Sequence, residues 1–200
     1  ATKNAAEKAD GGDQPVSLED FARAYRHLDN CDPTTDVVIA EIDGEMVAYG
    51  RVQWWEEYDG ARRYQPFCFV LPEARGRGMG AAMLAHNEAR LRQIAAAHPV
   101  GGERTLQVFH ADQEAGAAAL YAAAGYRSVL HGAEMVRPDL MDIPEVPLPE
   151  GLVVRTPGDD ELRRVWEAEA EAFRDHLGAA PPTESDYRAF LDNPYNDPTL

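Results

Sequence analysis

The spacing of hydrophobic residues changes from a strand period to a helix period in the first part of the chain. Three apolar segments alternate with polar positions and are joined by two Asp-Gly pairs, which are typical of tight hairpins. Further along, Leu84, Leu91 and Ile94 recur at helical spacing on one stripe. The predicted strands are 36–41, 46–55, 63–70, 105–109, 126–130 and 133–136, and the predicted helices are 17–29, 80–97 and 112–124. The order β-β-β-α-β-α-β predicts an α/β (α+β) fold, in which helices flank a mixed, mostly antiparallel sheet.

A proline and a pair of tryptophans in the predicted strands indicate where those strands lie relative to the sheet edge and the core. Pro66 has no backbone N–H and therefore predicts a bulge or an edge position within the strand 63–70. Trp54 and Trp55 are neighbours in a strand, so alternation sends one of them to the core and leaves the other to line a cleft.

Beyond residue 140 the pattern starts again. Prolines at 144, 147 and 149 predict a semi-rigid linker at 141–150. After the linker, the pattern predicts a strand at 152–155 and helices at about 159–173 and 183–193.

This last segment repeats the beginning of the chain. The residues that match at constant spacing are Pro15, Ser17, Asp20 and Phe21 with Pro181, Thr183, Asp186 and Tyr187, followed by Asp32-Pro33-Thr34 with Asp197-Pro198-Thr199. We therefore interpret 1–140 as one domain that lacks its first strand, and 151–200 as the start of a second, truncated copy.

The net charge of −16 limits the expected partners. A strongly negative surface repels a phosphate backbone and attracts cations such as amines, so we expect no nucleic-acid partner. No apolar stretch is long enough for a membrane helix, and the first ten residues lack the apolar core of a signal peptide. Cys31 and Cys68 show neither metal-binding nor disulfide spacing, so we expect a cytoplasmic protein without a metal.

A glycine-rich loop, Arg75-Gly76-Arg77-Gly78-Met79-Gly80, lies between a predicted strand and a predicted helix. Glycines permit a tight turn that exposes backbone N–H groups, and the helix N-terminus adds partial positive charge, so the loop is suited to a pyrophosphate. A Walker loop would need Gly-Lys-Ser/Thr, which is absent. A Rossmann site would need a parallel βαβ unit, whereas antiparallel hairpins precede this loop.

Together with a second motif, the loop resembles the GNAT acetyltransferase family. The residues that fit the family's Arg/Gln-x-x-Gly-x-Gly/Ala signature are Arg75, Gly78 and Gly80, preceded by Val70-Leu71-Pro72-Glu73. Those that fit its second signature, near a helix end, are Leu120-Tyr121 and Gly125-Tyr126. The resemblance covers roughly 17–137, and tandem arrangements of two such domains are known in this family.

The resemblance implies a GNAT fold, acetyl-CoA as co-substrate and a small amine as acceptor. It implies that the backbone of the loop binds the coenzyme pyrophosphate, and that the pantetheine arm enters where the strands 63–70 and 105–109 splay apart. Tyr121 is the implied general acid, because a phenol with a pKa of about 10 is suited to protonating the departing thiolate. The implied coenzyme-binding residues are Phe69, Val70, Arg75, Gly76, Arg77, Gly78, Met79 and Gly80.

Three points stay open at this level. The family often has Asn seven residues before the tyrosine, but Glu114 stands there in this chain. The candidates for a general base, all at predicted strand ends, are Glu56, Glu57, His110 and Glu134. The alternatives to a catalytic domain are a dinucleotide-dependent oxidoreductase and an acetyl-CoA-binding domain without turnover, which would have a regulatory or structural role beside a catalytic partner domain. As a further partner we expect a second GNAT-like domain or another copy of the chain in a homo-oligomer.

Overall fold

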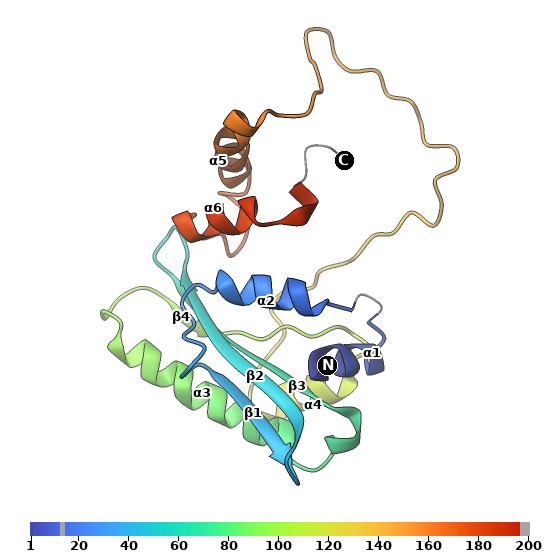
Figure 1. Cartoon of the computed structure of the whole chain (residues 1–200). Helices are drawn as coiled ribbons and strands as arrows, with labels where there is room; N and C mark the ends of the chain where they lie inside the picture. Colours follow the sequence, from blue (N-terminus) through green and yellow to red (C-terminus); the bar gives the residue numbers. More distant parts are fainter. Residues whose placement is uncertain (13–14, 197–200) are drawn as a thin grey trace.

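A four-stranded sheet forms the centre of the computed structural model, which describes residues 1–12 and 15–196 (Figure 1). The strands lie in the order β1-β2-β3-β4; the first three are antiparallel to their neighbours, and β4 is parallel to β3. Their bounds are Val37–Ile42 for β1, Glu45–Glu56 for β2, Arg62–Val70 for β3 and Arg104–Leu106 for β4. The predicted mixed, mostly antiparallel sheet is confirmed.

The two Asp-Gly pairs form the turns that set the register of the sheet. Asp43 and Gly44, between β1 and β2, have φ of 54° and 83°, and positive φ at both positions is what a two-residue hairpin requires. Between β2 and β3, Gly60 has φ of 83°, and the Asp59 carboxylate accepts a hydrogen bond from the Ala61 N–H at 2.9 Å. Both turns therefore form where the sequence predicts them.

The pairing between β3 and β4 is short, and the strands separate beyond it. Tyr64 pairs with Leu106, and the Gln107 N–H donates to the Tyr64 carbonyl oxygen at 2.9 Å. Pro66 follows on β3 and has no N–H to offer to a further partner, which confirms the edge position that the sequence predicts for it. β4 is therefore shorter than the predicted strand 105–109, and it leaves the end of β3 unpaired on one side in the described part of the chain.

Helices cover both faces of the sheet (Figure 1). The helices of this part are α1 (Thr2–Ala9), α2 (Leu18–Arg26), α3 (Met79–Ala97) and α4 (Ala115–Ala123), with a short 3-10 helix, η1, at Pro72–Ala74. α1 and α2 lie on the face that carries Tyr49 and Phe69, because Phe21 contacts the Tyr49 ring and the Lys3 ammonium group lies over the Phe69 ring. α3 lies on the opposite face, against Gly50.

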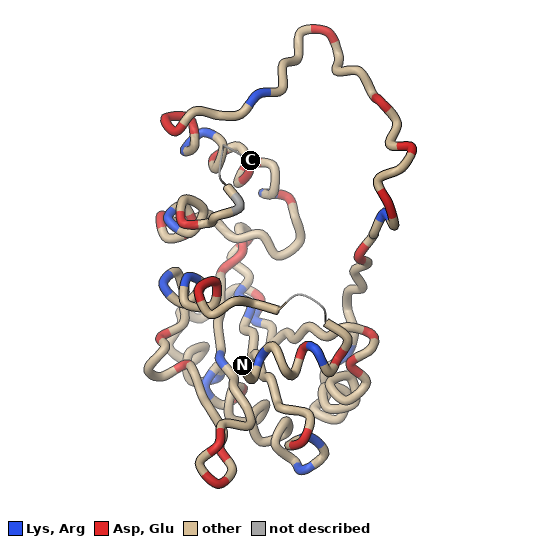
Figure 2. The backbone as a smooth tube through the Cα atoms, turned by 45° about the vertical axis from the view of Figure 1, so that its right-hand side comes forward, with Lys and Arg blue, Asp and Glu red and all other residues tan. Residues whose placement is uncertain are grey.

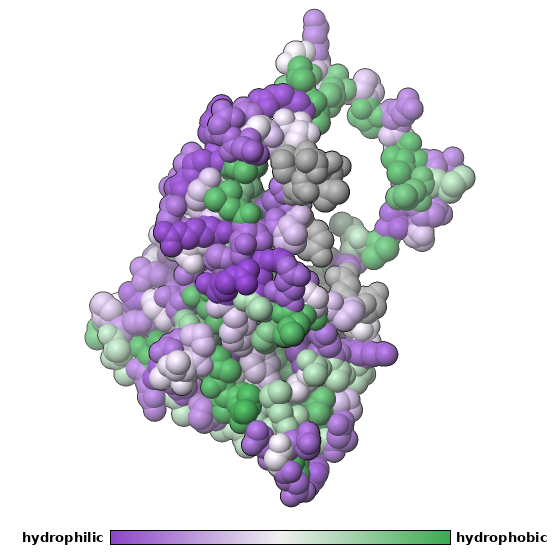
Figure 3. Space-filling model, in the orientation of Figure 1, coloured by the Kyte–Doolittle hydropathy of each residue, from purple (hydrophilic) through white to green (hydrophobic). Residues whose placement is uncertain are grey.

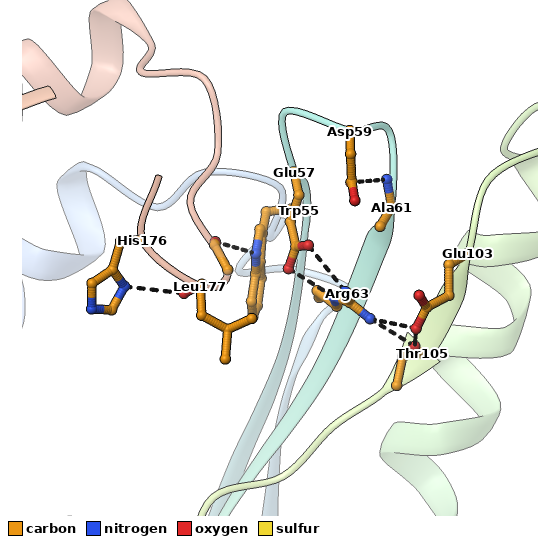
Figure 4. A network of polar contacts seen from close by, with 10 residues as sticks. Trp55, Glu57, Asp59, Ala61, Arg63, Glu103, Thr105, His176 and Leu177 are labelled. Atoms are coloured by element: carbon orange, nitrogen blue, oxygen red, sulfur yellow. Dashed lines mark hydrogen bonds and ion pairs between the residues drawn. The ribbon is translucent and has the colours of Figure 1, made fainter. Parts of the chain in front are cut away.

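The core lies between the sheet and α3. Val52 of β2, Tyr64 of β3 and Leu91 of α3 are at most 2% exposed and form its centre. Trp54 packs against this cluster. Trp55 points the other way, toward the C-terminal segment, so the two neighbouring tryptophans divide between core and surface as strand alternation predicts (Figure 4).

The segment after α4 contains no strand. The strands predicted at 126–130, 133–136 and 152–155 are absent from the described structure. Alternating apolar residues form a strand only where a neighbouring strand offers free backbone groups, and β4 ends at Leu106 before it can offer more than a short edge. The segment runs instead as a long arc with exposed apolar side chains, and the predicted linker 141–150 lies within it (Figure 1, Figure 3).

The last described helices lie against α2 and the turn between β2 and β3 (Figure 1, Figure 4). Their bounds are Asp159–Glu161 for η2, Leu162–Ala172 for α5, Glu184–Leu191 for α6 and Pro194–Asn196 for η3. α5 and α6 meet through Trp166 and Tyr187, whose ring centroids are 5.2 Å apart. The Trp55 Nε1–H donates to the Gly178 carbonyl oxygen at 3.1 Å and so links this segment to β2.

Candidate functional site

The glycine-rich loop leads from η1 into the N-terminus of α3. Gly76 and Gly78 have φ of 72° and 83°, a left-handed conformation that residues with a Cβ rarely adopt. Gly78 is the N-cap of α3 and has no side chain to accept hydrogen bonds from the first turn. The N–H groups of Met79 and Gly80 therefore have no acceptor within the helix and lie at its positive end. This is the arrangement by which helix N-termini bind phosphate groups.

Arg75, in contrast, is engaged with other parts of the protein. Its Nε donates to the Val70 carbonyl oxygen at 3.0 Å, and its two terminal nitrogens donate to the Asp10 carboxylate at 2.6 and 2.8 Å. One of these nitrogens also donates to the Ala6 carbonyl oxygen at 3.2 Å. Arg75 thus ties the loop to α1 and to the end of β3, whereas Arg77 is exposed at the tip of the loop.

At the end of β3, every second residue directs its backbone N–H and C=O groups toward the unpaired edge. Arg62 and Tyr64 direct their backbone groups toward β4, since the Arg62 N–H donates to the Glu103 carbonyl oxygen and Tyr64 accepts from Gln107. By the same alternation, Cys68 and Val70 direct theirs into the gap beyond β4, while Phe69 pairs with β2. The backbone groups of Phe69, for which the sequence predicts a binding role, therefore face β2, whereas those of Cys68 and the Val70 N–H face the gap.

Tyr121 lies on α4 and is half-buried. Its ring centroid is 6.1 Å from that of His110, which follows β4, and 5.8 Å from that of Tyr126. Burial raises the pKa of the Tyr121 hydroxyl above its ordinary value, and the nearby Cys68 and Glu114 act in the same direction. The hydroxyl therefore keeps its proton at neutral pH and is able to act as an acid.

The loop and Tyr121 are brought together by contacts between α3 and α4. Leu120, the residue before the tyrosine, lies against Gly80 in the first turn of α3. The Tyr126 hydroxyl donates to the Glu88 carboxylate of α3 at 2.9 Å. The two sequence motifs, which are far apart in the chain, therefore lie side by side in the fold.

Glu114 occupies the place where the family often has Asn. It is the N-cap residue of α4, and its Oε2 accepts from the Ala111 N–H at 2.6 Å. Its own N–H donates to the Ala111 carbonyl oxygen at 2.9 Å. The carboxylate is thus used to close the turn before α4, and its charge faces Tyr121.

The two candidate bases at the end of β2 are neutralised by arginines. Glu56 forms an ion pair with Arg62 at 2.6 Å. Glu57 accepts two hydrogen bonds from Arg63, at 2.7 and 3.0 Å, in the network that faces the C-terminal segment (Figure 4). Both carboxylates are therefore held in ion pairs with arginines.

Of the other two candidates, Glu134 is exposed on the arc after α4 and His110 lies in the site. His110 is half-buried beside Tyr121, and its Nδ1 is 3.0 Å from the Ala111 carbonyl oxygen. The structure therefore brings one of the four predicted bases next to the predicted acid.

Negative charge is spread over the whole molecule rather than gathered at this site. Figure 2 shows Asp and Glu along most of the backbone, with Lys and Arg between them. Within the described residues no group of His, Cys, Asp and Glu could hold a metal ion. None of the described helices is long and apolar enough to cross a membrane.

Two residues of the site were not predicted from the sequence. The position of Cys68 follows from strand parity, by counting forward in steps of two from Arg62 in the first β3–β4 pair, and that pair is known only from the structure. Asp10, the partner of Arg75, carries no such signal. It lies 65 positions away in the chain, and no local pattern connects the two residues.

The sequence is similar to a family of acetyltransferases and to curated proteins named as acetyltransferases. Residues 33–128 match the family model of the Acetyltransferase (GNAT) domain. The mycothiol acetyltransferase of Thermomonospora curvata is 37% identical over 189 residues, which are 92% of this chain and 50% of that protein. That of Geodermatophilus obscurus is 31% identical over 169 residues, 82% of this chain and 50% of that protein.

A solved structure is similar over nearly the whole chain. The GCN5-related N-acetyltransferase from Sphaerobacter thermophilus matches with a TM-score of 0.65 and 25% identity, covering 98% of this chain and 60% of that one. The chain spans about half the length of the curated relatives it matches. These matches show that residues 33–128 are similar to the GNAT acetyltransferase domain, and that the fold is one that a GCN5-related N-acetyltransferase shares.

Proposed function

We propose that this domain transfers the acetyl group of acetyl-CoA to a small-molecule amine, which attacks the thioester directly. The observation that carries the proposal is the contact between Gly80 and Leu120. It brings a phosphate-binding helix end beside a half-buried tyrosine hydroxyl whose pKa is raised, so that coenzyme binding and acid catalysis meet in one place.

The loop, the free edge of β3 and Tyr121 correspond in turn to the pyrophosphate, the pantetheine arm and the thioester sulfur of acetyl-CoA. The N–H groups of residues 76–80 bind the pyrophosphate, and the exposed Arg77 adds positive charge there. The free edge at Val70 and Cys68 then pairs with the pantetheine arm as an added strand would. Tyr121, beside Cys68, protonates the sulfur as the C–S bond breaks. Arg75 positions the loop through Asp10 rather than contacting the coenzyme.

The names of the relatives and the net charge indicate which class of acceptor to test. Both curated relatives are named mycothiol acetyltransferase, and the solved structure is named an N-acetyltransferase. The net charge of −16 favours an acceptor that arrives as a cation, as a protonated amine does. A small primary amine is therefore the acceptor class that we propose.

A second GNAT-like domain is proposed to begin at residue 151. Ser17 and Thr183, equivalent in the predicted repeat, cap α2 and α6 in the same way, each accepting from a backbone N–H three residues on. None of the described residues from 151 onward is buried, as expected of a domain start without its sheet. The remaining part of the repeat, Asp197-Pro198-Thr199, lies outside the described residues.

A second candidate function is acetyl-CoA binding without turnover. The observation that favours it is Glu114, whose carboxylate closes a turn at the position where the family often has Asn. In this case the domain would bind the coenzyme on the same loop but would not turn over an amine. The loop and Tyr121 would then serve binding alone.

The test combines binding and turnover. Acetyl-CoA affinity is measured by calorimetry, and acetyl-CoA consumption is measured with polyamines, aminoglycosides, amino acids, N-terminal peptides and the acceptor of the mycothiol acetyltransferases. We expect binding, and turnover with one class of amine. Binding without turnover across the panel supports the second candidate, and absence of binding contradicts both.

A further inference from the structure

We propose that His110 is the general base that accepts the proton of the attacking amine, so that His110 and Tyr121 form a base–acid pair across the reacting thioester. The inference rests on the proposed acetyl transfer and names a residue for its missing step. It is carried by the position of His110, four residues after the end of β4 and beyond the point where β3 and β4 part, with its ring centroid 6.1 Å from that of Tyr121.

The tautomer of His110 follows from its one hydrogen bond. Nδ1 lies 3.0 Å from the Ala111 carbonyl oxygen, and a carbonyl oxygen only accepts hydrogen bonds. Nδ1 must therefore carry the proton. In the neutral ring, Nε2 is left with its lone pair, and no hydrogen bond to Nε2 is formed by the described residues. A histidine held in this way is oriented to take up a proton at Nε2.

The neighbouring ionisable groups do not compete for this role. Burial raises the pKa of the Cys68 thiol to about 11, so the thiol stays protonated at neutral pH. Tyr121 also stays protonated, because burial raises its pKa. Glu114 accepts a hydrogen bond from the Ala111 N–H, on the same turn that orients His110. The carboxylate therefore helps to fix the turn while His110 keeps the free nitrogen.

The proposed step conserves atoms and charge. The amine gives its ammonium proton to water before it attacks, so that its nitrogen has a free electron pair. The nitrogen then forms a bond to the carbonyl carbon, and its surplus proton passes to His110 Nε2. The C–S bond breaks with both electrons going to sulfur, and the Tyr121 hydroxyl gives its proton to that sulfur. Transfer of the proton from His110 to the tyrosinate, through water, restores both residues. The products are the acetylated amine and free coenzyme A.

The substitution His110→Asn removes the proposed base but keeps the hydrogen bond to Ala111. The Asn side-chain NH₂ can replace Nδ1–H as donor to Ala111, but Asn has no group in place of Nε2. With the amine found in the panel, we expect kcat to fall on the order of a hundredfold to ten-thousandfold, with acetyl-CoA affinity within about twofold of the unmodified protein. Added imidazole should restore part of the rate. His86→Asn, at an exposed position on α3, is the matched control and should keep full activity.

A second measurement does not depend on turnover. Nitrogen-15 NMR of histidine-labelled protein with acetyl-CoA bound should show the Nδ1–H tautomer for His110, identified as the signal that His110→Asn removes. His176, whose Nδ1 lies 3.1 Å from the Leu177 carbonyl oxygen, should give a second signal of this kind that the substitution leaves in place. An Nε2–H tautomer for His110, or a kcat of His110→Asn within about threefold of the unmodified protein, would overturn the proposal while leaving acetyl transfer intact. Absence of turnover in the unmodified protein overturns the acetyl transfer itself, and the base with it.

Discussion

A Cβ atom on Gly80 would lie 3.3 Å from Leu120 Cδ2, so the first turn of α3 and the helix that carries Tyr121 touch without room for a larger side chain. Gly80→Val would therefore push α4 away as well as shield the loop, and we expect lower acetyl-CoA affinity together with a lower Tm. Gly78 is different, because nothing lies within 4 Å of a Cβ placed there. Gly78→Ala should cost about 1–2 kcal/mol through its positive φ and leave α4 in place. Calorimetry and thermal unfolding of both variants check this, and equal effects would contradict it.

Tyr121→Phe tests the acid while keeping the ring. The phenol proton is needed only as the thiolate leaves, so kcat should fall on the order of a hundredfold or more while the acetyl-CoA Kd changes little. The matched control is Tyr126→Phe, which removes a hydroxyl bound to Glu88 and should act on stability instead. Steady-state kinetics and calorimetry separate these effects. Full kcat in Tyr121→Phe would show that the hydroxyl has no part in the chemistry.

Replacing Asp10, the partner of Arg75, should change the acetyl-CoA affinity in opposite directions for two different roles of Arg75. If Arg75 acts by tying the loop to α1, Asp10→Asn loosens the loop and weakens acetyl-CoA binding. If Arg75 instead binds the pyrophosphate directly, removing the competing carboxylate strengthens binding. We expect weakening, by up to about tenfold, because four contacts hold the guanidinium away from a ligand. Arg75→Lys, which cannot keep the bidentate geometry, should weaken binding in the same direction.

The contrast between α2 and α1 shows which elements the sequence could predict. Ser17 caps α2 through the Asp20 N–H, a signal that lies within four residues and can be read locally. α1 has no such local signal, because its pattern of apolar residues is weak. It is held by packing on β3 and by the Asp10–Arg75 pair, which are contacts between distant parts of the chain.

The prediction of strands at 126–130 and 133–136 was wrong for a related reason. Alternation states which face of a strand would be buried, but not whether a partner edge is present. Val129 and Met135 fit the pattern and are nevertheless 86% and 93% exposed. The loop and Tyr121 could be located from the sequence, because they belong to local motifs. His110 could be named only as one of four candidate bases, and both its selection and the role of Cys68 depend on how β3 and β4 part, which required the structure.

Cys68 should make the stability of the protein fall at high pH. Its pKa is raised from 9.0 to about 11 because burial disfavours the thiolate. Between these values the unfolded chain loses the thiol proton while the folded chain keeps it, so folding loses stability as pH rises from 9 toward 11, and the full contribution is present below pH 9. Two pKa units correspond to roughly 2–3 kcal/mol. Urea unfolding at pH 8 and pH 10.5 should show a smaller loss in Cys68→Ala than in the unmodified protein; an equal loss would assign it to other groups.

The C-terminal segment should open independently of the sheet. α5 and α6 bury none of their residues, whereas α3 buries Met83, Leu84, Asn87 and Leu91. Hydrogen exchange should therefore be fast in 162–191 and slow in α3, because protection follows buried contacts. Asp192 pairs with Arg26 and His27 across the contact with α2.

Asp192→Ala should accordingly speed exchange in 162–191 further and leave α3 unchanged. Glu167→Ala, which removes a carboxylate that pairs with Arg163 within α5, is the matched control and should not affect the contact with α2. Exchange measured by mass spectrometry distinguishes the outcomes. Protection of 162–191 equal to that of α3 would mean that the segment belongs to the core of this domain, because a helix pair without buried residues of its own can be so protected only by joining a larger cooperative unit.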